Sequence, residues 1–532
     1  MKFKFFLLSV FWSVTLFGQV NFGYDIQLNP ITIPNLPGLH SYAVAQHEGK
    51  WLIIGGRKDG LHARQPFNAF PANQNNTTIY VVDLANLSFT SAGITSLPTA
   101  LQEQLQATNV NFIQDGNALY LIGGYGYSAA NSNHITHNKL TAVDVPGLMQ
   151  AIQQATPISG YFKQITDENM AITGGQLGKI GNRFYLVGGH RFDGRYNPMN
   201  NPTYTQTYSN QIWSFEIENT ATNFQILNYQ TQTDALHLHR RDYNLVPQVF
   251  PSGELGYTIS SGVFQPNADL PFLYPIDLTA NGYIPQTGFN QYLSNYHSGK
   301  SGLYSAQNNA MYSLFFGGMS QYQWINNSLI QDNLVPFVKT ISCVERKANG
   351  DLAETKLPVE MPNLHGASAE FIYNTNLPHY ENEVIKLDEI TANEFVIGHL
   401  YGGIKSSSAN PFNSNQTNST SAESVIYEVK LIKNPDLSLP ELNGRNPLSF
   451  GIYPNPIKQS QCALQFNLPY AGAVHYFVSS LNGQIIAEGD FTNSQTGSNK
   501  ETIALPETQS ATLLLTLVFD AKYFATQKLM RE

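Results

Sequence analysis

The sequence predicts an all-β protein, because one strand-like unit returns along most of its length. In each copy a short apolar run, rich in β-branched and aromatic residues, ends in two glycines, which is typical of a buried strand that stops abruptly. The copies end at Gly56, Gly124, Gly189, Gly318 and Gly403, and a degraded copy ends at Ser261 and Gly262. The composition agrees: only 13% of the residues are charged, about half the usual quarter, which suits an exported, β-rich protein.

The copies recur at irregular intervals, which argues against a solenoid with rungs of fixed length and suits a propeller with variable loops. Each copy is followed by a loop and a second strand with an aromatic, most clearly Trp213. In this order the sequence resembles the kelch family over about residues 23 to 432. The resemblance implies a β-propeller whose blades hold four antiparallel strands. The fourth copy departs from the family pattern, with Ser261 in place of the first glycine.

The N-terminal residues 24 to 34 alternate between polar and apolar side chains, like an outermost strand, and have no glycine pair of their own. The last repeat has one further strand, at residues 424 to 431, and no obvious fourth. We therefore expect a six-bladed ring that the N-terminal strand closes, which removes the exposed edges of an open array.

Residues 1–19 have the pattern of a signal peptide, with Lys2 and Lys4 before an apolar run at residues 5 to 17. The run is shorter than the ~20 residues that span a bilayer, so we expect cleavage near Gly18 and no transmembrane segment in the mature chain. The net charge of −9 and the lack of basic runs argue against a nucleic-acid partner. Cys343 and Cys462 fall in different predicted domains, which excludes a disulfide framework.

The C-terminal part is predicted to be a small β-sandwich-like domain, residues 448–532, after a Pro- and Asn-rich linker, residues 433–447. It resembles the C-terminal sorting domain of type IX secretion in Tyr453, Pro454, Asn455 and Pro456, in a turn at residues 481 to 484, and in Lys528 near the end. Residues 510 to 513 lack the Gly-Xaa-Tyr that the family usually has there. The resemblance implies a protein of a Gram-negative bacterium that is secreted or attached to the outer surface, with the type IX machinery as its partner. The predicted propeller then covers residues 20–432.

A ligand site is predicted at the channel mouth, because in an antiparallel blade the turn into the first strand and the loop after the glycine pair share one face. Period-two alternation places His239, Arg241 and Tyr243 together on one side of their strand. The candidate binding residues are His40, Tyr42, His190, Arg191, Arg195, His239, Arg241, Tyr243, His297 and His365. Tyr42 and Tyr243 are expected to stack on the ligand, and an excess of cationic groups favours an anionic one. The alternative is that these side chains only form hydrogen bonds with neighbouring turns and bind no ligand.

The sequence favours a binding protein over an enzyme. It contains no nucleophile elbow, phosphate loop, paired-cysteine metal motif or dinucleotide fingerprint. The candidate histidines come from four blades, and Cys343 is misplaced for a copper-radical oxidase, so we expect neither a metal nor another cofactor. The favoured ligand is an extracellular glycan or protein. The alternative is a glycan-active enzyme, by analogy with kelch-type sugar epimerases and oxidases, whose turnover would depend on His239 or Arg241.

Overall fold

The computed structural model describes residues 22–434 apart from 66, 200–202 and 327, and residues 448–531 apart from 459, 482–483, 507–511 and 521–522. The chain divides into two compact units, Met1–Leu437 and Ser438–Glu532. The expected signal peptide and nearly all of the expected linker lie outside the described residues. None of the helices described is long and apolar enough to cross a membrane.

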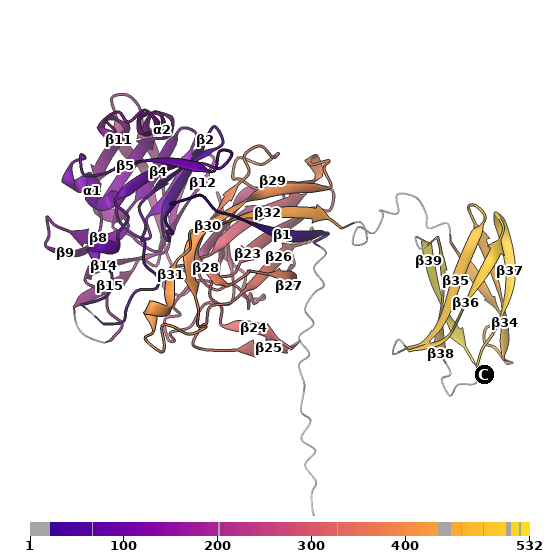
Figure 1. Cartoon of the computed structure of the whole chain (residues 1–532). Helices are drawn as coiled ribbons and strands as arrows, with labels where there is room; N and C mark the ends of the chain where they lie inside the picture. The colour runs from indigo at the N-terminus through magenta and orange to yellow at the C-terminus, as the bar shows by residue number, and fades with distance from the viewer. Residues whose placement is uncertain are drawn as a thin grey trace, which may run out of the picture. The chain divides into compact units, whose positions relative to one another are not determined.

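The first unit is almost entirely β, with multiple four-stranded antiparallel sheets in a propeller-like arrangement (Figure 1). Each copy of the repeat lies in its own sheet, and we number these six sheets in chain order. Sheet 1 contains β2 (Ala43–His47), β3 (Lys50–Ile54), β4 (Thr78–Asp83) and β5 (Ser88–Gly93). Sheet 2 contains β6 (Asn111–Asp115), β7 (Ala118–Ile122), β10 (Lys139–Asp144) and β11 (Phe162–Thr166). Sheet 3 contains β12 (Gln176–Ile180), β13 (Arg183–Val187), β16 (Gln211–Asn219) and β17 (Phe224–Thr233).

The other three repeat sheets follow the same order, with small additions. Sheet 4 contains β18 (Asn244–Val249), β19 (Leu255–Ser260), β20 (Ile276–Thr279) and β21 (Gly282–Pro285). Sheet 5 contains β22 (Gly299–Ser305), β23 (Ala310–Phe316), β26 (Thr340–Arg346), β27 (Leu352–Glu360) and the short parallel strand β29 (Ile385–Lys386). Sheet 6 contains β28 (Leu364–Tyr373), β30 (Glu394–Ser406), β31 (Thr420–Ala422), β32 (Ile426–Lys433) and β1 (Tyr24–Ile31).

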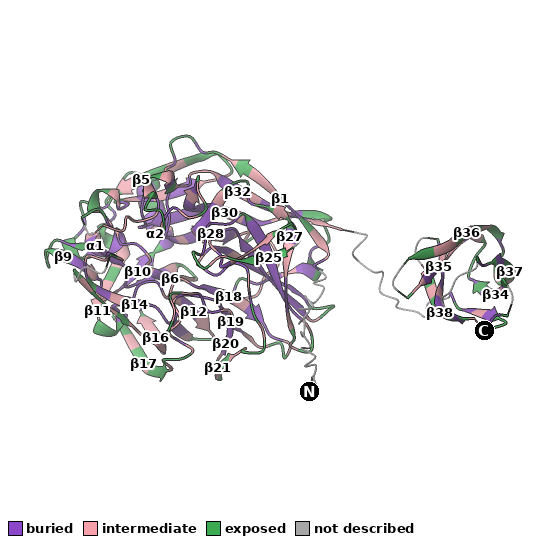
Figure 2. Cartoon of the chain, turned by 90° about the horizontal axis from the view of Figure 1, so that it is seen from below, coloured by how far each residue is buried: buried purple, intermediate pink, exposed green. Residues whose placement is uncertain are grey.

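In all six sheets the outermost strand is less buried than the two strands inside it (Figure 2). The first strands of sheets 1 to 6 contact one another in chain order, whereas outer strands such as β5 and β17 are largely exposed. This explains the sequence pattern, because a strand between two others needs apolar side chains on both faces and an edge strand does not.

The N-terminal strand completes the last sheet, as the sequence predicts. β1 pairs antiparallel with β32 from Tyr24 opposite Lys433 to Ile31 opposite Ile426. In Figure 1 the indigo β1 lies beside the orange β32, although some 400 residues separate them. The chain therefore closes the array by pairing its first described strand with its last strand before the second unit.

The glycine pair makes a close backbone contact between neighbouring sheets. Both glycines have positive φ in every copy, for example 67° and 87° at Gly123 and Gly124, and Ser261 keeps φ at 57° in the degraded copy. The second residue of each pair donates its N–H to a carbonyl of the segment that leads into the next sheet, or of its first strand in the case of His365: Gly56 to Ala107, Gly124 to Ile172, Gly189 to Arg240, Gly262 to Asn295, Gly318 to His365 and Gly403 to Leu39. A Cβ at Gly123 would lie 1.8 Å from the Ile172 oxygen, so only glycine permits this approach.

A second cycle of main-chain hydrogen bonds surrounds the axis. It joins six residues, which together we call the six-residue ring: Ser41, Asn109, Gly174, Asp242, His297 and Ser368. The first five lie two residues before the first strand of their sheet, and Ser368 lies inside β28. Each N–H donates to the carbonyl of its neighbour, at 3.2 Å from Asn109 to Ser41, 3.4 Å from Gly174 to Asn109, 2.7 Å from Asp242 to Gly174, 2.7 Å from His297 to Asp242, 2.8 Å from Ser368 to His297 and 3.1 Å from Ser41 to Ser368. The last bond joins sheet 1 to sheet 6, so this cycle is closed.

The structure adds helices and strands that the sequence did not predict. Helix α1 (Thr99–Leu105) and helix α2 (Val145–Gln153) pack in the core that sheets 1 and 2 share. Asp144 caps the start of α2, and its carboxylate accepts the Gly147 N–H. Short 3-10 turns are η1 (Ala72–Gln74), η2 (Ser159–Tyr161), η3 (Glu168–Met170), η4 (Leu387–Glu389) and η5 (Thr417–Ser419). The loops after the glycine pairs form a sheet of β8 (Tyr125–Ser128), β9 (Asn133–Thr136), β14 (His190–Gly194) and β15 (Tyr204–Tyr208), and a hairpin of β24 (Tyr322–Ile325) and β25 (Ser328–Gln331).

His137 predicts a loss of stability in acid. The side chain is 2% exposed, and burial lowers the pKa of its imidazole to about 4, against about 6.5 in the unfolded chain. The unfolded state therefore takes up a proton first, and the contribution to stability is lost as the pH falls from about 6.5 towards 4. Between about pH 7.5 and pH 5 this one group should remove about 2 kcal/mol from the free energy of unfolding.

Urea unfolding of His137→Asn at the two pH values tests this expectation. The variant cannot take up the proton, so its stability should fall by about 2 kcal/mol less than that of the unmodified chain. His47→Asn is the matched control, because His47 is half-buried next to Glu48 at the edge of β2. An unchanged pH dependence in His137→Asn would contradict the assignment.

The second unit contains two antiparallel sheets with a common apolar core. One sheet holds β33 (Phe450–Tyr453), β34 (Gln461–Leu468) and β37 (Gly497–Ala504). The other holds β35 (Gly472–Ser480), β36 (Ile485–Ser494), β38 (Thr512–Phe519) and β39 (Tyr523–Met530). Leu464 from the first sheet and Leu515 from the second are both fully buried in one hydrophobic cluster, so each sheet covers the apolar face of the other.

Candidate functional site

The ion pair of Arg241 and Asp242 lies where sheet 4 joins the six-residue ring. Arg241 donates to the Asp242 carboxylate and, at 3.2 Å, to the Tyr208 hydroxyl, and its guanidinium lies 5.1 Å from the centre of the Phe264 ring. The other Asp242 oxygen accepts from the Asn109 amide at 3.1 Å, between two ring members that are not neighbours. Arg241 and Asp242 keep 14% and 16% of their side-chain surface exposed. The pair is thus held rigidly while water still reaches it.

Half-buried aromatic side chains gather around this pair. Tyr208 stacks on His239 with the ring centres 3.8 Å apart, and Arg241 acts electrostatically on Tyr196, Tyr208 and Tyr296. Burial raises the pKa of Tyr196 and of Tyr296, and the Arg241 charge opposes the shift. These hydroxyls therefore stay protonated at neutral pH and can donate and accept hydrogen bonds.

Tyr196 connects this group to a second aromatic group, most of which lies on the loop between β3 and β4 of sheet 1. The His62 ring lies 4.9 Å from Phe70, nearly parallel to it, and meets Tyr196 edge-on at 5.2 Å and Phe412 at 5.5 Å. Burial lowers the pKa of His62 to about 4, the Ala63 carbonyl opposes this, and Arg241 and Arg57 lower it further. We call His62, Tyr196, Tyr208, Arg241 and Tyr296 the loop-face cluster.

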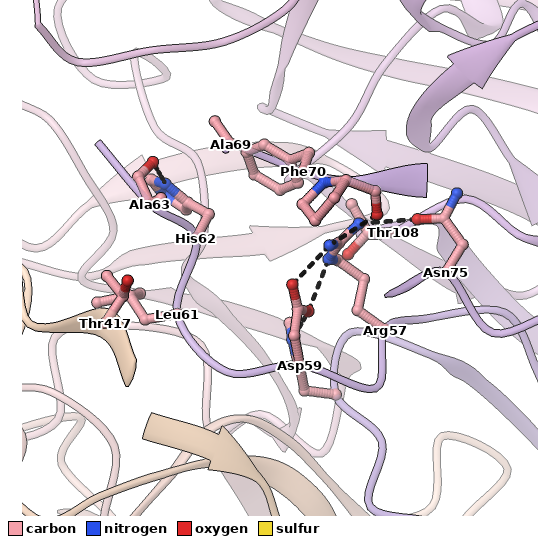
Figure 3. Close-up of polar contacts among 12 residues, drawn as sticks. Arg57, Asp59, Leu61, His62, Ala63, Ala69, Phe70, Asn75, Thr108 and Thr417 are labelled. Atoms are coloured by element: carbon pink, nitrogen blue, oxygen red, sulfur yellow. Dashed lines mark hydrogen bonds and ion pairs between the residues drawn. The ribbon is translucent and has the colours of Figure 1, made fainter. Parts of the chain in front are cut away.

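Arg57 holds the loop that carries His62 (Figure 3). It donates from Nε and Nη2 to the two Asp59 oxygens at 2.9 and 2.6 Å, and from Nη1 to Asn75 at 2.7 Å. Burial would raise the pKa of Asp59, but hydrogen bonds from His40 and Arg57 bring it below its usual value. The close-up shows Phe70 beside this network, with Arg57 5.3 Å from its ring centre.

The structure brings some of the predicted site residues together at this place. Arg241 belongs to the loop-face cluster, and His239 stacks on its Tyr208. His190 lies 5.7 Å from the same tyrosine ring, accepts a hydrogen bond from the Gln206 amide nitrogen at 2.8 Å, and has its pKa lowered well below 6.5 by burial and by Arg241. His297 is a member of the six-residue ring and pairs with Glu370 at 3.2 Å.

The other predicted residues have structural partners. Tyr42 and Tyr243 are 1% and 0% exposed and donate to the carbonyls of Tyr401 and Val187, so neither offers a face for stacking, contrary to the expectation. His40 contacts Ser41 and Asp59, His365 contacts the Gly402 carbonyl, and Arg195 donates to the Ala69 carbonyl. Arg191 pairs with Asp193 and Glu168. Burial lowers the pKa of both His40 and His365.

These pairings change the expected charge of the site. Arg57, Arg191 and Arg241 each lie against an aspartate, so at these positions the structure lacks the excess of cationic groups that the sequence suggested. Among the described residues no group of three or more His, Cys, Asp or Glu side chains is placed to hold a metal ion. Sequence reasoning did not select His62, Tyr196, Tyr208 or Tyr296, although Tyr296 directly precedes the predicted His297.

The predicted sorting motif is one connected turn in the second unit. The Asn455 amide donates to the Lys528 carbonyl at 2.8 Å, and its oxygen accepts the Met530 N–H at 2.9 Å. Asn455 therefore joins the segment of Tyr453, Pro454 and Pro456 to the last strand, β39. The predicted residues at the two ends of this unit are thus adjacent in space.

Comparison with known proteins leaves the site without an assigned role. No family model and no curated protein matches the sequence. A solved structure with similarity to this chain is that of YjhT, at 11% sequence identity and a TM-score of 0.43, over 76% of this chain and 99% of that one. The role of the loop-face cluster therefore has to be argued from its geometry.

Proposed function

We propose that the first unit is a six-bladed, kelch-like β-propeller that binds an extracellular glycan at the loop-face cluster. The observation that carries the proposal is the set of half-buried tyrosines around the Arg241–Asp242 pair. Tyrosine rings pack against the apolar faces of sugars, and their hydroxyls bond sugar hydroxyls. The ion pair offers donors and acceptors with little net charge, so the cluster suits hydroxyl-rich glycans better than strongly anionic ones.

The export route is part of the proposal. The resemblance of residues 448–532 to a type IX sorting domain, the Asn455 turn and the signal-peptide pattern of residues 1–19 support a protein that is secreted or attached to the outer surface. The second unit then acts as an address for the secretion machinery. Intact C-terminal peptides in exported material, found by mass spectrometry, would contradict this role.

A glycan array followed by calorimetry on the mature chain tests the binding function. Arg241→Gln should weaken binding of any glycan found by at least about tenfold, because the Tyr208 hydroxyl and the Asp242 carboxylate lose the arginine that holds both of them. Arg191→Gln is the matched control. That arginine follows a glycine pair on the same face but pairs with Asp193 and Glu168, so its loss should leave affinity unchanged.

If Arg241→Gln and Arg191→Gln change the glycan affinity equally, the loop-face cluster is not the binding site. Loss of thermal stability in Arg241→Gln with unchanged affinity would assign Arg241 a purely structural role. Turnover of a bound glycan, absent in Arg241→Gln, would instead favour the carbohydrate-active enzyme that the sequence left open.

A further inference from the structure

A cavity of about 320 Å³ lies along the axis that the six first strands surround. It begins beneath the six-residue ring, five of whose members line it, and follows the first strands away from the loop face. None of the residues of the loop-face cluster lines it. With room for about ten water molecules, it is at the lower end of the size range of small-molecule sites.

The cavity is reached from the end away from the loop face. The six-residue ring narrows the cavity at its loop-face end, because only six residues, joined by hydrogen bonds, surround the axis there. The hydrogen bond between Asn109 and Asp242 also crosses the inside of this ring. At the other end Gly181, Glu381 and Glu383 are exposed and line the cavity. A small solute can therefore enter without passing the proposed glycan site.

Most charged side chains in the lining are already paired. Lys179 lies 2.7 Å from Asp115, Glu370 pairs with His297 at 3.2 Å, and Asp242 pairs with Arg241. Lys300 on β22 differs from Lys179, since its ammonium group has neither an ion pair nor a hydrogen bond with any residue that the structure describes. Within the same described part of the chain, the Glu383 carboxylate also has no partner.

Lys300 and Glu383 both line the cavity and interact electrostatically without touching. Burial lowers the pKa of Lys300, and the charges of Glu370 and Glu383 oppose this shift. Burial raises the pKa of the Glu383 carboxyl, although part of the side chain stays exposed to water. The charges of Lys300 and His379 oppose this shift. Two opposite charges thus face a common space, and each lacks a partner at bonding distance.

We propose that this cavity binds a free amino acid, with its carboxylate on Lys300 and its ammonium group on Glu383. A zwitterion supplies one counter-charge to Lys300 and one to Glu383, and it adds no net charge to the cavity. Lys300 is partly buried, and a charged group that loses contact with water needs such a partner, because an unpaired charge in a confined site is costly. Val44, Phe112 and Pro247 also line the cavity and offer apolar surface for a small side chain.

Calorimetric titration of the mature chain with the twenty free L-α-amino acids tests the site. We expect at least one to bind, and both its amide, which lacks the carboxylate, and its N-acetyl form, which lacks the ammonium group, to bind at least about tenfold more weakly. Lys300→Met and Glu383→Gln should each weaken binding to the same extent. Lys179→Met is the matched control, because this second lysine of the lining already has Asp115 as its partner.

A second measurement uses the unmodified chain and so does not depend on the folding of a variant. Reductive methylation with formaldehyde and borohydride, read by peptide mass spectrometry, should label Lys300, and the bound amino acid should slow this labelling relative to that of Lys179. The ratio is the readout, because reagent consumed by the free amino acid slows the labelling of both lysines equally. The proposal is wrong if no amino acid binds up to about 10 mM, if the amide or N-acetyl form binds equally well, or if Lys300 is not protected.

Discussion

Removal of residues 20 to 31 from the mature chain should destabilise the first unit by at least about 4 kcal/mol. The deletion takes away β1, and with it the buried Phe22 and Ile26 of the core shared with sheets 5 and 6. Burial of two such side chains contributes about 1.5 to 3 kcal/mol each. The deletion also leaves β32 as an unpaired edge beside β30, which favours aggregation. Thermal and urea unfolding of the truncated and intact chains measure the loss.

A peptide added in trans separates strand pairing from a general defect. A synthetic peptide of residues 22 to 33 can pair with β32 in the register of β1 and should restore part of the lost stability. A scrambled peptide of the same composition should not. If the truncated chain unfolds at the same temperature as the intact chain, β1 contributes nothing to closure.

Gly123→Ala should cost at least about 3 kcal/mol, because three effects combine. The added Cβ would lie 1.8 Å from the Ile172 oxygen, φ at this residue is 67°, and the displacement would break the Gly124 bond to Ile172. Left-handed strain alone costs about 1 to 3 kcal/mol, and a lost hydrogen bond about 0.5 to 1.5. The free energy of unfolding in urea gives the total.

Gly116→Ala is the matched control for backbone strain. Gly116 lies in the same sheet with φ at 58°, but a Cβ there meets nothing within 4 Å. Its substitution should cost only about 1 to 2 kcal/mol. Equal losses at the two positions would mean that the contact between sheets adds nothing to the conformational preference of glycine.

The repeated strands of the first unit could be predicted from the sequence, because the conformation of each strand and its glycine pair depends on residues that are close in sequence. An apolar strand that ends in two residues with left-handed φ needs glycine at those two positions in almost every copy. The structure shows the same conformation even at Ser261. The alternation of polar and apolar side chains at residues 24 to 34 likewise indicates an edge strand, which the structure places beside β32. Helix α2 was missed although Asp144 and Pro146 mark its start, because the repeat pattern favoured strands throughout.

The site was harder to predict, because its members come from loops of different sheets. His62, Tyr208 and Tyr296 meet only through the paths of the loops, and no spacing in the sequence encodes those paths. One local signal was overlooked. Asp59, Asp193 and Asp242 stand within two residues of Arg57, Arg191 and Arg241, and a neighbouring carboxylate of this kind neutralises an arginine before any ligand arrives.

The pairing of β1 with β32 also sets the order in which the molecule can mature. The Asn434 N–H donates to the Gly23 carbonyl at 3.0 Å, so the two ends of the first unit meet. Sheet 6 therefore stays incomplete until residue 433 has been synthesised. Contacts this distant in sequence form slowly. A nascent chain therefore cannot lock the first unit into its final shape until nearly all of that unit has been made.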